Sequence, residues 1–309
     1  MLQHKHLLGL EGYPSKDIQT IIDTAFGFRK VLERPIKKVP SLQGKTVVNL
    51  FFEMSTRTRI SFELAQKRMS ADTVAFSAAS SSLNKGESFK DTVQNIEAMK
   101  IDAVILRHPA SGAPRHLTKF VDAIVINAGD GTHEHPTQAI LDMMSLQEQF
   151  NNLEGLKVGI IGDISHSRVA LSNIFGLTTM GADVMICGPS TLMPSHIEKL
   201  GVKVSYDMDE VVDWADAVNI LRIQLERMGT GLYPSIREYR ELFGLSVERI
   251  KRHSKDLVVM HPGPMNRGTE IDSAVADSDR AIILDQVLNG VASRMAILYL
   301  LLGGKMEEN

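Results

Sequence analysis

The sequence predicts an α/β fold made of two doubly wound domains, each with a parallel sheet flanked by helices. Short β-branched or aliphatic runs alternate with amphipathic stretches along the chain, which is the pattern of parallel α/β proteins. The 309 residues are also about twice the ~150 of a typical domain. We expect domains at 1–142 and 143–285, with a C-terminal helix over 286–309 packing back on the first domain.

The expected strands fall into two sets, separated by a turn near residues 151–155. The first set covers 46–52, 73–76, 103–106 and 123–127, and the second covers 157–161, 183–187, 217–221, 257–260 and 281–284. Helix signals lie between the strands. Ser15 is the expected cap of the first helix, and Ser88 with Asp91 resembles a capping box ahead of another.

Composition excludes several classes of protein. With 34 Lys and Arg against 37 Asp and Glu, the net charge of −3 argues against broad nucleic-acid binding. The only cysteine, Cys187, cannot form an internal disulfide, so a reducing, cytoplasmic setting is expected. No apolar run approaches the ~18–20 residues of a membrane span, and the N-terminus lacks a signal-peptide pattern.

The strongest local feature is a polar segment that follows the expected strand 46–52. Ser55, Thr56, Arg57 and Thr58 open an amphipathic helix. Unpaired N–H groups at a helix N-terminus, with hydroxyls and a guanidinium, favour binding of an anion such as phosphate. Arg57 and Arg59 point in nearly opposite directions on a helix, and we assign Arg57 to the ligand. The alternative is an ordinary serine-capped helix with exposed arginines.

A second feature is His135 followed by Pro136, which suits the first position of a helix. This places the imidazole beyond a strand end, where α/β proteins bind ligands. Alternatives are a capping histidine and a metal site using His133, Glu134 and His135. The deaminase pattern, which also begins with His-x-Glu, needs two further cysteines and is excluded by the single cysteine.

Other polar segments follow expected strands or lie in loops, and each alone is a weak signal. Gly159 and Gly162 hint at a dinucleotide site, but the Gly-x-Gly-x-x-Gly spacing is absent. The Gly263–Pro264 bond can be cis or trans. These segments contain Ser81, Lys85, Arg107, Arg168, Arg222, Gln224 and the stiff turn His261-Pro262-Gly263-Pro264.

Taken in order, these motifs resemble the aspartate/ornithine carbamoyltransferase family over essentially the whole chain. The resemblance is carried by Ser55-Thr56-Arg57-Thr58-Arg59, Lys85-Gly86-Glu87, Arg107-His108-Pro109, His135-Pro136-Thr137-Gln138-Ala139, Arg168, Arg222-x-Gln224-x-Glu226-Arg227 and His261-Pro262-Gly263-Pro264. The Arg-x-Gln-x-Glu-Arg segment is similar to the aspartate branch. Gly263 replaces a leucine that is common in that branch, but other bacterial members resemble this form.

The resemblance implies carbamoyl transfer from carbamoyl phosphate to L-aspartate, in pyrimidine biosynthesis, without cofactor or metal. It assigns carbamoyl phosphate to domain 1–142 and aspartate to domain 143–285. The implied carbamoyl phosphate ligands are Ser55, Thr56, Arg57, Thr58, Ser81, Lys85, Arg107, His135, Gln138, Gly263 and Pro264. Of these, Arg57, Thr58, Lys85, Arg107 and His135 are the implied catalytic residues. The implied aspartate ligands are Lys85, Arg168, Arg222 and Gln224.

The resemblance also implies a homotrimer, in which Ser81 and Lys85 reach a neighbouring subunit's site. Binding of a regulatory chain or a dihydroorotase is left open. Two other functions also remain as alternatives. One is a carbamoyltransferase for another amine such as ornithine, and the other is a non-catalytic phosphate- or dinucleotide-binding protein.

Overall fold

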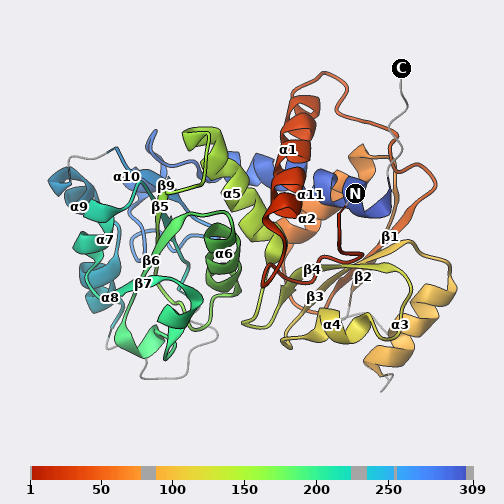
Figure 1. The fold of residues 1–309 in the computed structure, drawn as a ribbon, viewed down its shortest axis with the longest axis horizontal. Coiled ribbons are helices and arrows are strands. Elements are labelled where there is room, and N and C mark those ends of the chain that lie inside the picture. The colour runs from red at the N-terminus through yellow and green to blue at the C-terminus, as the bar shows by residue number, and fades with distance from the viewer. Residues whose placement is uncertain (1, 78–87, 224–234, 254–255, 304–309) are drawn as a thin grey trace. The chain divides into compact units, whose positions relative to one another are not determined.

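The computed structural model describes residues 2–77, 88–223, 235–253 and 256–303 (Figure 1). The chain divides into two compact units. Unit 1 comprises Met1–Met144 with Leu288–Asn309, and unit 2 comprises Ser145–Val287. Each unit contains its own parallel sheet, so the predicted fold class is confirmed.

Unit 1 contains a four-stranded parallel sheet in the order β2-β1-β3-β4. The chain runs from β1 to β2 on one side and then returns to β3 and β4 on the other. Phe51 of β1 lies opposite Arg107 of β3, which sets the register at the carboxyl edge. The strands are β1 (Thr46–Phe51), β2 (Asp72–Ser77), β3 (Ala103–His108) and β4 (Ile124–Asp130).

Helices pack on this sheet because their apolar faces match buried strand residues. Buried aliphatic side chains of β1, β3 and β4 form one core cluster with Val93 and Leu117, which lie on helices. The Ser88 hydroxyl accepts a hydrogen bond from Asp91 N at 3.1 Å, as the capping box predicts. The helices are α1 (Ser15–Leu32), α2 (Thr56–Arg68), α3 (Phe89–Ala98), α4 (Ala113–Leu117) and the first part of α5 (Pro136–Phe150).

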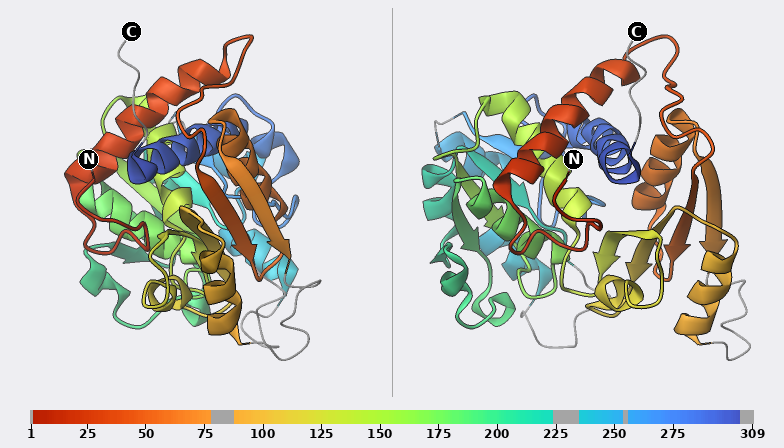
Figure 2. Two further views of the ribbon diagram at one scale, coloured as in Figure 1. Left: turned by 90° about the vertical axis from the view of Figure 1, so that its right-hand side faces the viewer. Right: turned by 45° about the vertical axis from the view of Figure 1, so that its right-hand side comes forward.

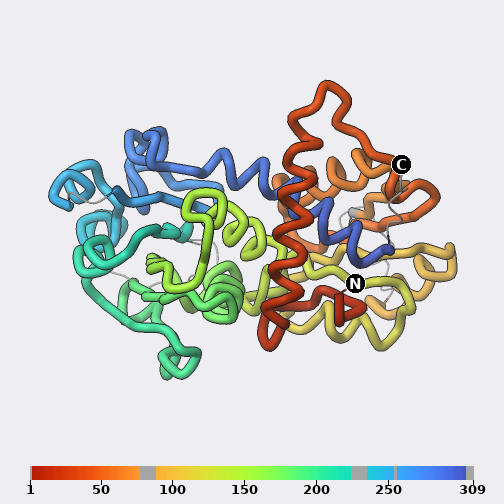
Figure 3. The backbone as a smooth tube through the Cα atoms, turned by 45° about the horizontal axis from the view of Figure 1, so that its top comes forward, coloured from red at the N-terminus to blue at the C-terminus, as the bar shows by residue number. Residues whose placement is uncertain are grey.

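The C-terminal helix α11 (Ile283–Leu302) packs back on unit 1, as predicted. Figures 2 and 3 show it beside α1, and Figure 2 also shows it beside α2. Arg29 Nε donates to Asn289 Oδ1 at 3.0 Å, which joins α1 to α11. The Arg294 guanidinium of α11 lies 5.0 Å from the centre of the Phe62 ring in α2.

Unit 2 contains a five-stranded parallel sheet in the order β7-β6-β5-β8-β9. Its strands are β5 (Lys157–Ile161), β6 (Asp183–Cys187), β7 (Lys203–Ser205), β8 (Ala217–Ile220) and β9 (Val258–Met260). Its helices are α6 (Arg168–Thr179), α7 (Met208–Trp214), α8 (Ile236–Phe243), α9 (Val247–Arg252) and α10 (Ser273–Ala276), with short 3-10 turns at Ser190–Leu192 and Ile197–Leu200.

Three details differ from the prediction. The strand expected at 281–284 is only a single bridge between Ala281 and Val259, because α11 begins at Ile283. The three-residue strand β7 was not predicted, since so short a run carries no periodicity. Pro14, rather than Ser15, occupies the N-cap of α1. Among the described residues, no helix is long and apolar enough to cross a membrane.

Candidate active site

In unit 1, the predicted anion-binding residues follow three adjacent strands. The segment 55–58 follows β1, Arg107 is the last but one residue of β3, and His135 follows β4. The chain reverses its direction of winding between β1 and β3. Ligands of doubly wound sheets bind at the carboxyl ends of the strands at such a switch point. The topology therefore brings these predicted residues to one edge of the sheet.

The segment after β1 has the features of an anion-binding helix start. Ser55 is the N-cap of α2, but its side chain makes no capping hydrogen bond to that helix. Thr56 and Arg57 are exposed, whereas Thr58 is buried, with 9 % of its surface exposed. The first N–H groups of a helix have no partner within it, so they are suited to an anion. Arg59 instead pairs with Glu63 along α2, at 3.7 Å.

Arg107 is held at the end of β3 by contacts from two neighbouring strands. Its NH1 donates to the carbonyl of Ala128 at 3.1 Å, and its Nε lies 3.4 Å from Glu53 Oε2. The side chain remains 13 % exposed. Because Glu53 follows β1, this ion pair fixes the guanidinium beside the segment that leads into α2. Glu53 thus supports the loop that leads into α2.

His135 lies immediately before α5 and is almost completely buried, with 4 % exposed. Its Nδ1 is 3.5 Å from the hydroxyl of Thr137. Gln138 lies one turn into α5, and its side-chain amide donates to Asp142 Oδ1 at 3.0 Å. That bond orients the Gln138 carbonyl oxygen away from Asp142. These contacts fix Gln138 in the first turn of α5 and His135 directly before that helix.

The loop between β4 and His135 is organised by Asp130, which is buried. Burial favours the neutral acid, but hydrogen bonds from His133, Asn127 and the Gly112 N–H outweigh it and lower the pKa of Asp130. In turn, the hydrogen bond to Asp130 raises the pKa of His133, against the effect of burial. The His133–Asp130 pair therefore favours the charged form of both side chains.

Glu134 is fully buried, and its carboxylate is used by backbone donors. Leu10 N donates to Oε2 at 2.7 Å and Glu11 N donates to Oε1 at 3.2 Å. His133 bonds to Asp130 instead of facing the same point as Glu134. The alternative reading of His133, Glu134 and His135 as metal ligands is therefore not favoured by the geometry.

In unit 2, the predicted residues again follow three adjacent strands. Arg168 begins α6 after β5, Arg222 follows β8, and the turn at 261–264 follows β9. In this sheet the winding reverses between β5 and β8. Arg168 and Arg222 therefore flank the switch point, where a carboxylate-bearing ligand would meet both guanidinium groups.

The turn before α6 is shaped by an aspartate that the sequence analysis did not single out. Asp163 is fully buried and accepts from His166 N at 3.1 Å, while His166 Nδ1 lies 2.9 Å from the same carboxylate. The Ser167 hydroxyl caps α6 by accepting from Ala170 N at 3.2 Å. These bonds fix the backbone that carries Arg168, of which 4 % is exposed.

The turn after β9 is organised by His261 and Glu270, which are both buried. Gly263 N donates to His261 Nδ1 at 2.7 Å, and His261 Nε2 lies 3.3 Å from Glu270 Oε1. Asn266 connects this turn to the β8 exit by donating to the carbonyl of Ile223 at 3.2 Å. The Gly263–Pro264 peptide bond is cis.

The structure thus groups the predicted residues as two sets, one per unit. Ser81, Lys85 and Gln224 lie outside the described residues. The supporting carboxylates were not predicted, because acidic residues in loops are common and nothing in the sequence distinguishes these, although several bond to partners only three or four positions away. The missed residues are Asp130, Asp142, Asp163 and Glu270, while Glu134 was considered only as a metal ligand.

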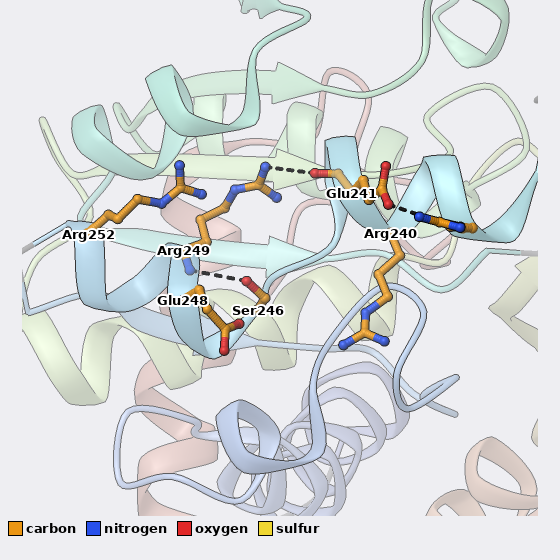
Figure 4. A pocket seen from close by; sticks show the side chains of 7 residues that line it. Arg240, Glu241, Ser246, Glu248, Arg249 and Arg252 are labelled. Atoms are coloured by element: carbon orange, nitrogen blue, oxygen red, sulfur yellow. Dashed lines mark hydrogen bonds and ion pairs between the residues drawn. The ribbon is translucent and has the colours of Figure 1, made fainter.

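A separate pocket in unit 2 is lined by arginines of α8 and α9 (Figure 4). Its arginines are already paired. Arg249 and Arg252 contact Asp209 at 2.5 and 3.5 Å, and Arg240 contacts Asp272 at 3.0 Å. The fourth, Arg237, contacts Glu241 at 3.1 Å. These ion pairs join α9 to α7 and join α8 to Asp272, the N-cap of α10.

These two units, each with basic residues at its switch point, define an α/β protein suited to two small anionic ligands. Known proteins identify the family. Residues 5–148 match the family model "Aspartate/ornithine carbamoyltransferase, carbamoyl-P binding domain", and residues 154–301 match its "Asp/Orn binding domain". The chain therefore belongs to the aspartate/ornithine carbamoyltransferase family.

Relatives of similar length are aspartate carbamoyltransferase catalytic subunits. The one from Cytophaga hutchinsonii is 57% identical over 304 residues, covering 98% of this chain and 99% of the relative. The one from Heliobacterium modesticaldum is 58% identical over 302 residues, covering 98% and 97%. The resemblance noted from the motifs is confirmed.

Solved structures of the family share the fold. Aspartate transcarbamoylase from Trypanosoma cruzi, in complex with carbamoyl phosphate, aligns with a TM-score of 0.88 at 28% identity, covering 96% of both chains. Ornithine carbamoyltransferase from Pyrococcus furiosus aligns with a TM-score of 0.85 at 28% identity, covering 97% and 98%. The fold is thus common to both branches and does not by itself distinguish the amine.

Proposed function

We propose that this chain transfers the carbamoyl group of carbamoyl phosphate to the amine of L-aspartate, giving N-carbamoyl-L-aspartate and phosphate. The observation that carries this proposal is the 55–58% identity to aspartate carbamoyltransferase catalytic subunits over nearly the whole chain. The alternative of a non-catalytic binding protein is disfavoured by the same relatives. The reaction places the chain in pyrimidine biosynthesis, and we assign it to the cytoplasm.

Unit 1 is the proposed carbamoyl phosphate site. The α2 N-terminus with Ser55, Thr56 and Arg57 binds the phosphate, and Arg107 is held beside it by Glu53. As the amine attacks the carbonyl, negative charge develops on the carbamoyl oxygen. Thr58, Arg107 and His135 are the proposed donors to that oxygen, and one such donor is typically worth about 10²- to 10³-fold in rate. Gln138 orients the carbamoyl amide.

Unit 2 is the proposed aspartate site. Arg168 and Arg222 flank the switch point of its sheet and bind the two carboxylates of aspartate. The family resemblance assigns the backbone at Gly263 and Pro264 to the carbamoyl group, and His261 and Glu270 hold that turn. No covalent nucleophile is needed, because the amine attacks directly and phosphate leaves with the amine's proton. Catalysis then comes from positioning the two substrates and stabilising charge.

We also propose that the chain assembles as a homotrimer with shared sites. Exposed apolar side chains support a subunit interface on α2 and the edge strand β2. Met54 is fully exposed, Ile60 and Leu64 lie one turn apart on α2 with 46% and 38% exposed, and Val74 of β2 is 48% exposed. Ser81 and Lys85, which are outside the described residues, complete the proposed site from a neighbouring subunit.

A panel of amine acceptors tests the proposed reaction. Purified protein is incubated with carbamoyl phosphate and, separately, L-aspartate, L-ornithine or no amine, and the carbamoylated product is measured. We expect product with aspartate alone. Product with ornithine would assign the chain to the other branch, and binding of carbamoyl phosphate without product from any amine would indicate a non-catalytic protein.

A further inference from the structure

The N-terminal segment of the chain lies along β4, the strand that leads to His135. Leu7 N donates to the Val125 carbonyl at 3.0 Å, and Asn127 N donates to the Leu7 carbonyl at 2.8 Å. The His6 ring accepts from Val125 N at 3.0 Å. Residues 6–8 thus extend the sheet by one short parallel bridge, although more than a hundred positions separate them from β4.

Glu134 continues this attachment beyond the end of β4. Its two carboxylate oxygens accept from the consecutive backbone donors of Leu10 and Glu11, at 2.7 and 3.2 Å. Gly9 passes so close that a Cβ built at this position would overlap Glu134 Oε1. The fit therefore depends both on a carboxylate at 134 and on the missing side chain at Gly9.

The backbone of Glu134 is fixed from the other side by Asp130. Glu134 N donates to Asp130 Oδ1 at 3.1 Å, and Asp130 N donates to the Glu134 carbonyl at 3.1 Å. Asp130 is itself held by Asn127 Nδ2 at 2.8 Å, and the same amide donates to the Leu8 carbonyl at 2.9 Å. One buried network therefore joins the N-terminal segment, the end of β4 and the residue that precedes His135.

From this arrangement we infer that Glu134, clasped by residues 9–11, is a positioning residue that sets the His135 imidazole for the reaction. The inference rests on the proposed function, because His135 is its proposed oxyanion donor. His135 follows Glu134 directly and precedes the rigid first turn of α5. Hydrogen bonds to both the backbone and the carboxylate of Glu134 leave the neighbouring imidazole few alternative positions, and preorganised donors need that restriction.

The two hydrogen bonds from Leu10 N and Glu11 N explain why a carboxylate is required at position 134. A carboxylate is an acceptor at both oxygens, so it satisfies two N–H donors at once. Glutamine has the same shape, but its NH₂ group would face one of those N–H groups. Glu134→Gln therefore loosens the loop without emptying the space that the side chain fills.

The first test compares Glu134→Gln with the matched control Glu11→Gln, which changes an exposed carboxylate on the same segment. Misplacement of a catalytic group by ~1 Å typically costs up to about 10²-fold, so we expect Glu134→Gln to lower kcat about 10- to 100-fold. The KM for carbamoyl phosphate should change little, because the phosphate cradle on α2 is separate. The control should behave as wild type. A normal kcat in folded Glu134→Gln would overturn the inference.

A double-mutant cycle shows whether Glu134 acts through His135. If it does, Glu134→Gln added to His135→Ala lowers kcat no further, because the group it positions is already absent. Full additivity of the two losses would overturn the inference. Absence of product with the wild-type protein would refute the proposed function instead, so the two failures are distinguishable.

Gly9→Ala gives an independent test that leaves both Glu134 and His135 in place. Its new methyl group would displace the carboxylate, so we expect the same loss of kcat as in Glu134→Gln. In a Glu134→Ala background the carboxylate is gone, so adding Gly9→Ala should lower kcat no further. An unchanged kcat in Gly9→Ala would contradict the proposed role of the contact between Glu134 and residues 9–11. Equal losses of kcat from Gly9→Ala in the wild-type protein and in Glu134→Ala would contradict it as well. Circular dichroism of each variant identifies any that fail to fold.

Discussion

Arg57 is the charged residue of the proposed phosphate site on α2. It is exposed at the start of α2, where the free N–H groups and the helix dipole favour an anion. Replacement by alanine removes a charge-assisted donor, and we expect kcat/KM to fall about 10²- to 10³-fold with the unfolding temperature unchanged. Arg59→Ala is the matched control, since Arg59 pairs with Glu63. Equal losses in both variants would argue against the assignment.

Substitution of Arg222 tests the proposal that unit 2 binds aspartate while unit 1 binds carbamoyl phosphate. It follows β8 at the switch point of the unit 2 sheet. Arg222→Ala should raise the KM for aspartate at least tenfold, as loss of a carboxylate ion pair worth about 1.5–3 kcal/mol implies, and change that for carbamoyl phosphate little. Arg237→Ala, an exposed arginine of the same unit, provides the control. A larger effect on the KM for carbamoyl phosphate would contradict the proposed roles.

The sequence indicates which residues form the site better than it indicates the contacts that hold them. The polar segments at 55–58, Arg107, His135, Arg168 and Arg222 are visible in the sequence because each follows a recognisable strand. Glu134 gave no such signal, since its partners at Leu10 and Glu11 lie more than 120 positions away. Glu270 likewise acts on the 261–264 turn through folded geometry alone.

The stabilising contribution of the loop after β4 should depend on pH, because His133 in this loop forms an ion pair with Asp130 at the end of β4. The raised pKa of His133 means that its stabilising contribution is complete below about pH 6.5, the ordinary value, and is lost as pH rises through the folded pKa. The lowered pKa of Asp130 acts oppositely, so its contribution is lost only as pH falls through that lowered value. Both contributions are therefore present together in mildly acidic solution.

Chemical denaturation across pH 6 to 8.5 measures this effect. Wild-type protein should lose free energy of unfolding as the pH rises, whereas His133→Gln should lose less over the same range. His133 is partly exposed, which limits the size of the difference. Identical pH dependence in the two proteins would show that the pair does not contribute to stability.

Strands were predicted best where an aliphatic run ends at a sharp turn. The strands at Lys157–Ile161 and Asp183–Cys187 match their expected bounds, because glycine or polar residues follow each. The run at 281–284 is also aliphatic, yet only Ala281 bridges to β9. Gln286 N donates to the Ile282 carbonyl at 2.9 Å, so the rest of the run belongs to the first turn of the long helix α11.

For the whole molecule, the exposed apolar residues of α2 and β2 predict assembly. Three chains of 34.1 kDa give about 102 kDa, and light scattering should find that mass or a multiple of it. Leu64→Lys places a charge on the proposed interface and should shift the mass toward 34 kDa with loss of activity. A fully active wild-type monomer would refute the shared site.

The near-neutral net charge of −3 conceals how positive charge is distributed. Four arginines, at 57, 107, 168 and 222, stand at the carboxyl ends of strands in two sheets. Carbamoyl phosphate and aspartate are both small anions, so one charged sheet edge for each substrate accounts for this placement. The sequence could indicate these residues, but only the strand orders place each pair at a switch point.

The most direct test follows carbamoyl phosphate labelled with ¹³C in its carbonyl group, by NMR, in the presence of L-aspartate. The account predicts that the label moves to N-carbamoyl-L-aspartate as one phosphate is released per product, and that Arg57→Ala and Arg222→Ala both slow this transfer. Release of phosphate with the label appearing only in hydrolysis products, or transfer that is unaffected by both substitutions, would contradict it.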